Sequence, residues 1–237
     1  MHRTILAPVM LATAASPAVA AEIQLQAQGP VVELAVTEIV KARPDVATVG
    51  AGVTSRAPTA VQAMQQTASA MDAVVRRIKA LGIADEDIQT TGIELGAQYD
   101  YNQAQQRQVF RGYQASNRVS VTLRKVPDTG RVLDALVAAG ATDISGPSFS
   151  IDDDTAPRAQ ARKAALDKAR LQAEEYARWA GYSGVRLLQV SEMLNPGRPM
   201  PYDMRVQTVS AEAKATPIEP GLVGTAVTVN VTYELTR

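Results

Sequence analysis

Hydrophobic and polar positions alternate along much of this chain, and these stretches are separated by others with a helical period. Near the N-terminus, Val32, Leu34 and Val36 alternate with polar or small residues, and the same pattern returns over 47–53. A period of two is typical of a strand with one buried face. The sequence therefore predicts a pair of strands joined by a turn at 41–45.

The longest alternating stretch predicts a long β-hairpin. Residues 93–101 and 113–123 alternate on either side of a polar, glutamine-rich turn at 102–107. Two such strands joined by a short polar turn form an antiparallel hairpin. Three more strands are expected, around 144–151, 185–193 and 225–235.

Three other stretches have the period of a helix. The first is expected to begin at the N-cap Thr59 and to end at Gly82, the second runs from about 128 to 139, and the third begins near Thr155. The third repeats alanine at every fourth position, so it can lie close to a sheet. The expected buried positions are Met64, Ala68, Met71, Val75, Ile78 and Leu81 in the first helix, Val132, Leu133, Leu136 and Val137 in the second, and Ala161, Ala165, Ala169, Ala173 and Ala177 in the third.

Helices mixed with hairpins favour an α+β fold, with antiparallel or mixed sheets built from strand pairs and the long hairpin and packed by three helices. Residues 81–88 and 139–144 resemble one another, since each has a helix stop, an acidic turn and a strand. The mature chain, 21–237, is therefore expected to be one domain or two related sub-units, at about 31–101 and 108–237.

The first twenty residues have the features of a secretory signal. A positively charged start precedes an apolar run over 5–15, and Ala18-Val19-Ala20 has the small residues that signal peptidase accepts. The run is shorter than the roughly 20 apolar residues that span a bilayer. We therefore expect cleavage after Ala20, export to the periplasm and no transmembrane segment.

The amino-acid composition limits the kinds of catalysis and binding that the protein can carry out. The chain has no cysteine and one histidine, His2, which lies in the predicted signal. The mature protein would lack thiol and imidazole groups, which argues against an enzyme and predicts no cofactor. The 24 Lys and Arg balance the 24 Asp and Glu without a basic cluster, which argues against nucleic acid as a partner.

Three motifs suggest sites but have simpler interpretations. Gly50-Ala51-Gly52 lacks the third glycine of a dinucleotide-binding loop, so a bulge or a close backbone approach is favoured. Asp152-Asp153-Asp154 precedes a predicted helix, where carboxylates cap exposed N–H groups, and it lacks the ligand spacing of a Ca²⁺ loop. Asp85-Asp87 has the same interpretation. A hydrolase based on paired carboxylates would need two acidic residues in one cleft, which the sequence does not show.

Met193, Met200 and Met204 flank a Pro- and Gly-rich loop. Thioethers can bind Cu(I), and they can be oxidised and repaired. The alternatives are a periplasmic binding module for a small ligand, a peptide or a copper ion, and a surface loop with incidental methionines.

Four aromatic residues lie close to the predicted hairpin turn, in a chain with only ten aromatics. They are Tyr99, Tyr101, Phe110 and Tyr113. Because no predicted helix is long enough to cover the tip, these side chains are candidates for an oligomer interface. The alternative is that they only cover the face of the sheet.

Several stretches together resemble one protein family. They are RPDVA at 43–47, GYQASNRVSV at 112–121, ARKAA at 161–165, PIEPG at 217–221 and VTVNVTY at 227–233. In this order they resemble the SIMPL-domain (DUF541) family, and with the leader the chain is similar to its periplasmic immunogenic members. The resemblance implies a secreted, non-enzymatic protein that forms homo-oligomers and is linked to oxidative-stress tolerance. It carries over no catalytic residue.

The first hypothesis is therefore an exported protein that assembles with itself, for example into a ring or channel, through the hairpin and exposed strand edges. The second is the periplasmic binding module.

Overall fold

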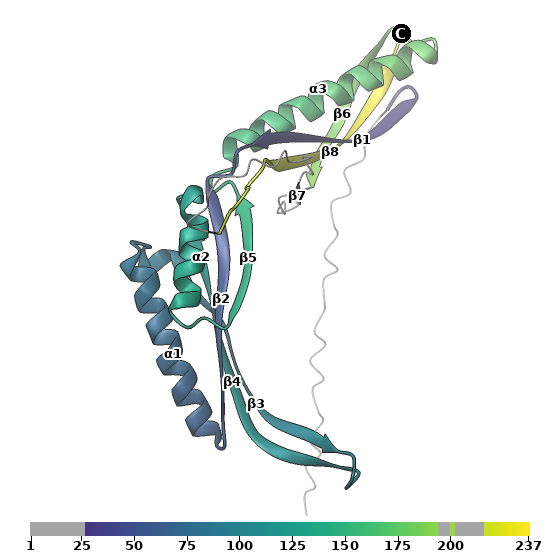
Figure 1. Cartoon of the computed structure of the whole chain (residues 1–237). Helices are drawn as coiled ribbons and strands as arrows, with labels where there is room; N and C mark the ends of the chain where they lie inside the picture. The colour runs from purple at the N-terminus through teal and green to yellow at the C-terminus, as the bar shows by residue number, and fades with distance from the viewer. Residues whose placement is uncertain (1–26, 194–199, 202–215) are drawn as a thin grey trace, which may run out of the picture.

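The computed structural model describes residues 27–193, 200–201 and 216–237. The predicted α+β class is confirmed: within these residues, three α-helices pack against two four-stranded sheets in which all paired strands are antiparallel (Figure 1). In chain order the elements are β1 (Val31–Ala42), β2 (Val46–Ala57), α1 (Ala60–Ala80), β3 (Ile88–Asn102), β4 (Arg107–Leu123), α2 (Thr129–Ala138), β5 (Asp143–Ser150), α3 (Thr155–Trp179), β6 (Gly184–Met193), β7 (Met200–Pro201) and β8 (Val223–Thr236).

The first sheet joins the two ends of the described chain. Its strand order is β1-β8-β6, with the short β7 also beside β8. Val36 of β1 lies opposite Val229 of β8, and Val229 lies opposite Glu192 of β6. This pairing places the valines of β1 and β8 on the face that α3 covers.

The predicted pairing of the first two strands is wrong, because β1 and β2 lie in different sheets. β2 pairs with β4 and β5 instead. The segment between β1 and β2 does not reverse the chain: Pro44 favours an extended conformation at Arg43, and the Asp45 N–H donates to the Ser150 carbonyl at 3.1 Å. The chain therefore bends from one sheet into the other, as Figure 1 shows.

The predicted alanine stripe holds α3 against the first sheet. Ala161, Ala165, Ala169, Ala173 and Ala177 are all fully buried, at most 1% exposed. Side chains this small let the helix approach the sheet closely.

Two ion pairs fix the direction of α3 on the sheet. Arg162 donates two hydrogen bonds to Glu192 of β6, at 2.5 and 2.9 Å, and Lys168 donates to Glu38 of β1 at 2.6 Å. The Arg162 guanidinium lowers the pKa of the Glu192 carboxyl.

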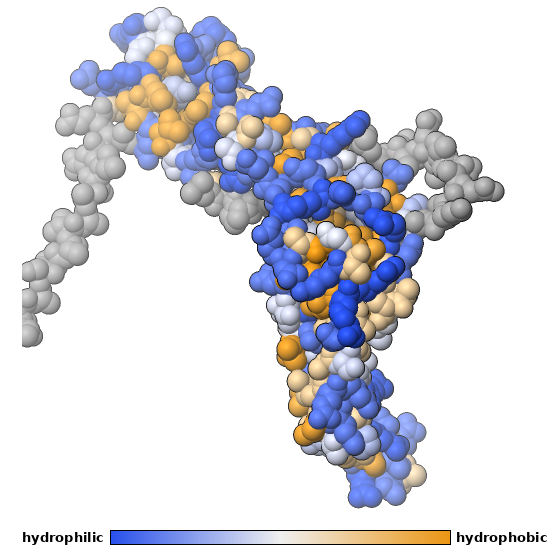
Figure 2. Space-filling model, turned by 90° about the vertical axis from the view of Figure 1, so that its left-hand side faces the viewer, coloured by the Kyte–Doolittle hydropathy of each residue, from blue (hydrophilic) through white to orange (hydrophobic). Residues whose placement is uncertain are grey.

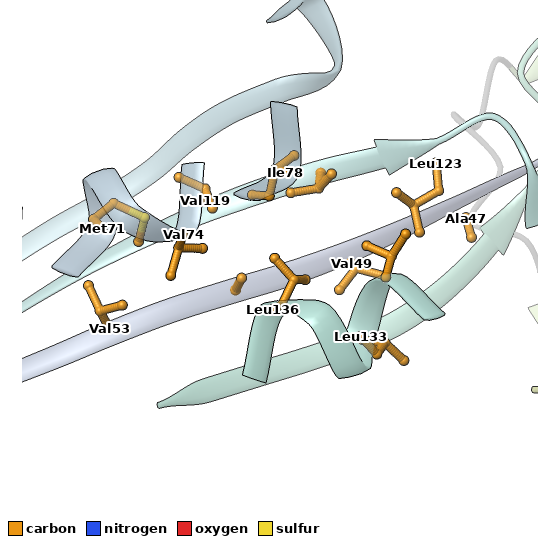
Figure 3. Close-up of a cluster of buried hydrophobic side chains, with 13 residues drawn as sticks. Ala47, Val49, Val53, Met71, Val74, Ile78, Val119, Leu123, Leu133 and Leu136 are labelled. Carbon is orange, nitrogen blue, oxygen red and sulfur yellow. The ribbon is translucent and has the colours of Figure 1, made fainter. Parts of the chain in front are cut away.

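The second sheet has the order β3-β4-β2-β5, and α1 and α2 pack on one of its faces. The alternating residues of β2 and β4 meet the two helices in one core, which Figure 3 shows. Its buried members are Ala47, Val49, Ala51, Val53, Met71, Val74, Ile78, Val119, Val121, Leu123, Val132, Leu133 and Leu136.

The first helix begins and ends as predicted, but it is rotated from the predicted stripe. The Thr59 side chain accepts from the Gln62 N–H, and Gly82 follows the helix with a φ of 82°. The buried residues are Ala63, Thr67, Met71, Val74 and Ile78, whereas the predicted Ala68 is exposed. The Thr67 hydroxyl donates to the Ala115 carbonyl at 3.2 Å, so a polar residue occupies a position that hydrophobicity alone assigns to the surface. In α2, the predicted inward Val137 is also exposed.

The segment before β8 returns to the second sheet. Thr216 donates from its backbone and its hydroxyl to Asp134 of α2, at 3.2 and 2.7 Å, and Ile218 packs against the core of that sheet. Gly130 permits this approach, since a Cβ there would lie 2.1 Å from the Thr216 carbonyl oxygen. The contact joins the two halves of the described fold.

A buried glutamate ties the N-terminal segment to the first sheet. Glu234 of β8 accepts from the Gln28 and Gly29 N–H groups at 2.6 Å each, and from the Arg186 guanidinium. Hydrogen bonding to Arg186, together with these N–H groups, lowers the pKa of the Glu234 carboxyl. The folded protein therefore favours the ionised form of the Glu234 carboxyl.

The close approach of α3 predicts different costs for one substitution at two neighbouring positions. Ala165→Leu adds volume where the helix meets the sheet, and we expect it to lower the free energy of unfolding by about 1–3 kcal/mol. Ala164→Leu changes an exposed position of the same helix and should stay within about 0.5 kcal/mol of wild type. Urea unfolding followed by circular dichroism measures both. Equal losses would show that α3 does not need its small residues.

The Glu234 contacts predict part of the dependence of stability on pH. A carboxyl whose pKa is lower in the folded state stabilises the fold above its unfolded pKa, about 4.3 for glutamate, and this contribution is lost as the pH falls through the folded pKa. Wild type should therefore lose more thermal stability between pH 6 and acid pH, about pH 3, than Glu234→Gln. Glu175→Gln, which removes the same charge from an exposed position of α3, is the control and should follow wild type. Parallel melting curves for wild type and Glu234→Gln would contradict this assignment.

Candidate functional site

The β3–β4 hairpin extends beyond the helices that cover its sheet. Figure 1 shows it curving away below the start of α1. α1 packs on β2 and β4, whereas β3 is the outer strand of the sheet. Of the helices in the described residues, none therefore covers the part of β3 that extends past α1.

The helix side of the hairpin follows from the strand register. Ala115 of β4 is buried against Ala63 of α1, and it lies opposite Leu95 of β3. Opposite residues of antiparallel strands point to the same face, and successive residues alternate. The odd-numbered residues 93–101 of β3 therefore lie on the helix side.

Three of the four predicted aromatic residues are in contact on this face. The rings of Tyr99 and Phe110 are 5.7 Å apart at 65°, and those of Phe110 and Tyr113 are 5.4 Å apart at 71°. These edge-to-face arrangements are favourable for aromatic pairs. Tyr113 is half-buried against Ala57, Ala63 and Ala115, so it anchors the row to the core.

The outer members of this row are open to solvent. Tyr99, Tyr101 and Phe110 are 56%, 64% and 46% exposed. Tyr101 lies two residues beyond Tyr99 towards the tip. Figure 2 shows hydrophobic residues at the surface of this lower part of the molecule, which contains the start of α1 and the hairpin.

The candidate list from the sequence missed two apolar residues of the same face. Ile93 and Leu95 are 57% and 47% exposed. Their alternation with Glu94 and Gly96 was visible in the sequence, but the pattern does not say that β3 is an outer strand. We call Ile93, Leu95, Tyr99, Tyr101 and Phe110 the hairpin surface.

Polar groups lie close to the hairpin surface, in the turn and on the other face of the strand pair. Arg111 donates to Asp100 at 2.8 Å, and Arg107 donates to Gln105 at 2.9 Å. Exposed aromatic side chains with polar groups nearby are typical of protein interfaces. The arrangement is suited to binding a protein surface.

A second exposed aromatic pair lies at the end of α3. The rings of Tyr176 and Trp179 are 5.5 Å apart. Leu171, earlier in the same helix, is also exposed. Trp179 is the single tryptophan of the chain.

The opposite face of the second sheet has a hollow of about 360 Å³. Thr48, Ser120, Ser145 and Ser148 line it, and Arg118 and Asp143 form an ion pair of 2.8 Å beside them.

The two glycines of the Gly-Ala-Gly motif form the floor of this hollow. A Cβ at Gly50 would lie 2.2 Å from the Ser145 hydroxyl, and a Cβ at Gly52 would lie 3.2 Å from Arg118 and from Asp143. The register with β5 also shifts between Thr48 and Gly50. The extra residue at this shift lies on β5, so the motif itself holds no bulge, and side chains of β4 and β5 approach its two glycines closely.

The acidic runs serve the fold. Asp153 accepts from the Thr155 N–H at 3.0 Å, and hydrogen bonding to Thr155 lowers the pKa of the Asp153 carboxyl. Asp154 pairs with Arg158, and Arg124 bridges Asp152 and Asp87. Asp153 thus accepts from the first N–H of α3 as predicted, whereas the side chain of the N-cap residue Asp154 makes no capping hydrogen bond. Asp85 pairs with Lys79.

Of the three methionines, Met193 ends β6 with an exposed side chain and Met200 lies in β7, whereas Met204 lies outside the described residues. Within the described residues, no group of three His, Cys, Asp or Glu side chains is arranged to hold a metal ion. In the same part of the chain, no helix is long and apolar enough to cross a membrane.

Known proteins resemble this chain over most of its length. A family model described as SIMPL, protein of unknown function (DUF541), matches residues 32–233. The 26 kDa periplasmic immunogenic proteins of Brucella abortus and Brucella melitensis are each 31% identical over 234 residues, which is 96% of this chain and 94% of theirs. The uncharacterized protein YggE of Escherichia coli is 32% identical over 149 residues, 63% of this chain and 60% of that protein. The family match runs from β1 to β8, and the chain therefore belongs to the SIMPL (DUF541) family.

Proposed function

We propose that this chain is an exported periplasmic protein that assembles with itself, and that it acts through the assembly and not through catalysis. The observation that supports this most is the hairpin surface. It presents two aliphatic and three aromatic side chains on a strand pair that extends past its covering helix. Monomeric soluble proteins rarely leave such a group of apolar side chains in water.

Composition and comparison support the other parts of the proposal. Without the predicted signal, the chain has neither histidine nor cysteine. The Brucella relatives are called periplasmic, and no relative named above is called an enzyme. The predicted signal peptide, residues 1–20, would direct this chain to the same compartment, although it lies outside the described residues.

The proposal includes a link to oxidative-stress tolerance, which the family resemblance implies. Exposed thioethers such as that of Met193 are groups that oxidants reach first and that reductases restore.

Self-assembly through the hairpin predicts a loss of mass when its aromatic rings are removed. The mature protein should run as a multiple of the single-chain mass in size-exclusion chromatography with light scattering. Tyr101→Ser combined with Phe110→Ser should shift it towards smaller species at micromolar concentration. Buried aromatic anchors are each worth about 2 kcal/mol of association free energy.

The matched control removes two exposed aromatics from α3, by Tyr176→Ser combined with Trp179→Ser. This variant should keep the wild-type mass. A wild-type protein that is monomeric at micromolar concentration would reject the proposal. A Tyr101→Ser, Phe110→Ser variant with unchanged mass would show that these two rings are not part of the interface.

A further inference from the structure

Among the described residues, no strand pairs with the outer edge of β3, which lies next to the hairpin surface. β3 is the first strand in the order β3-β4-β2-β5, so one row of its backbone N–H and C=O groups points away from the sheet. Such an edge is a template for another strand. Folded proteins usually protect it with proline, charge or a bulge.

The middle of β3 lacks these protections. The pairing of β3 with β4 is irregular between Thr90 and Gly92 and again between Gln98 and Tyr99, and it is regular from Gly92 to Gln98. This regular stretch has no proline and only one charged residue, Glu94. It is therefore able to accept a partner strand along its length.

We propose that β3 pairs antiparallel with β3 of a second copy, across a two-fold axis at Gly96, which joins two four-stranded sheets into one sheet. This inference rests on the proposed self-assembly and names the contact that makes it. A two-fold contact is self-complementary, so one strand can supply both sides.

The alternation of side chains limits the register. The odd-numbered residues 93–101 lie on the helix side, and directly opposite residues of an antiparallel pair share a face. An odd-numbered residue must therefore lie opposite an odd-numbered one, which leaves registers centred on a residue. Of these, the centres at Leu95, Gly96 and Ala97 lie around the middle of the stretch from Ile93 to Tyr99.

Charge and the irregular pairing select among these three registers. The centre at Ala97 places Glu94 opposite Asp100, which is unfavourable because like charges face each other. The centre at Leu95 places Tyr99 opposite Thr91, the extra residue at the irregular pairing, and Ile93 opposite Ala97, so no aromatic ring faces the regular stretch. The centre at Gly96 keeps Glu94 away from Asp100 and places Tyr99 opposite Ile93, and Tyr101 is then the ring that lies opposite Thr91.

The Gly96 register pairs the apolar residues well. It places Ile93 opposite Tyr99 and Leu95 opposite Ala97 on the helix side, and Glu94 opposite Gln98 on the other. β-Branched and aromatic residues are a favourable cross-strand pair. A second copy in this register would cover the exposed parts of Ile93, Leu95 and Tyr99 in both chains.

The chain is suited to a cysteine cross-linking test because it has no cysteine of its own. Gly92 and Gly96 are matched sites, since a Cβ at either meets nothing within 4 Å and neither has a positive φ. In the proposed register, two Gly96 residues face each other across the axis. Two Gly92 residues are eight positions apart along the strands, about 26 Å at about 3.3 Å per residue.

Mild oxidation, or a short bismaleimide, should therefore convert most of the mature Gly96→Cys protein into a covalent dimer on a denaturing gel. Gly92→Cys should remain a single chain under the same conditions. As a second pair of variants, a mixture of Glu94→Cys and Gln98→Cys chains should cross-link to one another, so the test does not depend on the folding of Gly96→Cys.

The outcomes separate this inference from the proposed function. If light scattering shows an oligomer but neither Gly96→Cys nor the mixture cross-links, the β3 contact is wrong and self-assembly stands. Equal cross-linking of Gly92→Cys and Gly96→Cys would also overturn the register. A β3 edge that binds an extended segment of a different protein would leave all the purified variants uncross-linked. A monomeric wild type without cross-linking would reject both proposals.

Discussion

The covering of apolar sheet faces is the constraint on which this structure depends. A strand that alternates apolar and polar residues is stable only when its apolar face is packed against something else. α3 covers the valines of β1 and β8, and α1 and α2 cover those of β2 and β4. Within the described part of the chain, no helix covers β3 between Ile93 and Tyr101, and the apolar side chains there are exposed.

The polar contacts of the described chain mainly hold these layers together. Arg162 and Lys168 fix α3 on its sheet, Glu234 holds the N-terminal segment, and Arg124 links Asp87 with Asp152. Each of these groups already has a partner within the fold. The hairpin surface differs from them because its side chains are apolar and exposed, and this is the physical reason for placing an interaction there.

Local patterns predicted the elements well. Short stretches of sequence predict four features that the structure has where they were expected. They are the Thr59 cap, the glycine at 82, the alanine repeat of α3 and the long hairpin. The sequence also predicted that the aromatic residues gather near the turn, but the register shift between Gln98 and Tyr99, which brings Tyr99 opposite Phe110, could not be predicted from it.

What the sequence could not show depends on distant parts of the chain. β1 pairs with β8 and not with β2, which follows it in the sequence, and no local hydrophobic pattern predicts that pairing. α1 is rotated from its predicted orientation so that the Thr67 hydroxyl donates to the Ala115 carbonyl. A pattern of hydrophobic residues does not predict this hydrogen bond. Ile93 and Leu95 were missed because their exposure follows from β3 being an outer strand.

The most direct test of the account is residue-resolved hydrogen exchange of the mature protein at the highest soluble concentration. In a single chain, alternate amides of residues 92–98 bond to β4 and the others point outward. If a second copy covers this strand, both sets should exchange slowly, as those of the central strand β2 do. Free exchange of every second amide over 92–98 would contradict the account, because it would show that the edge of β3 remains open to water.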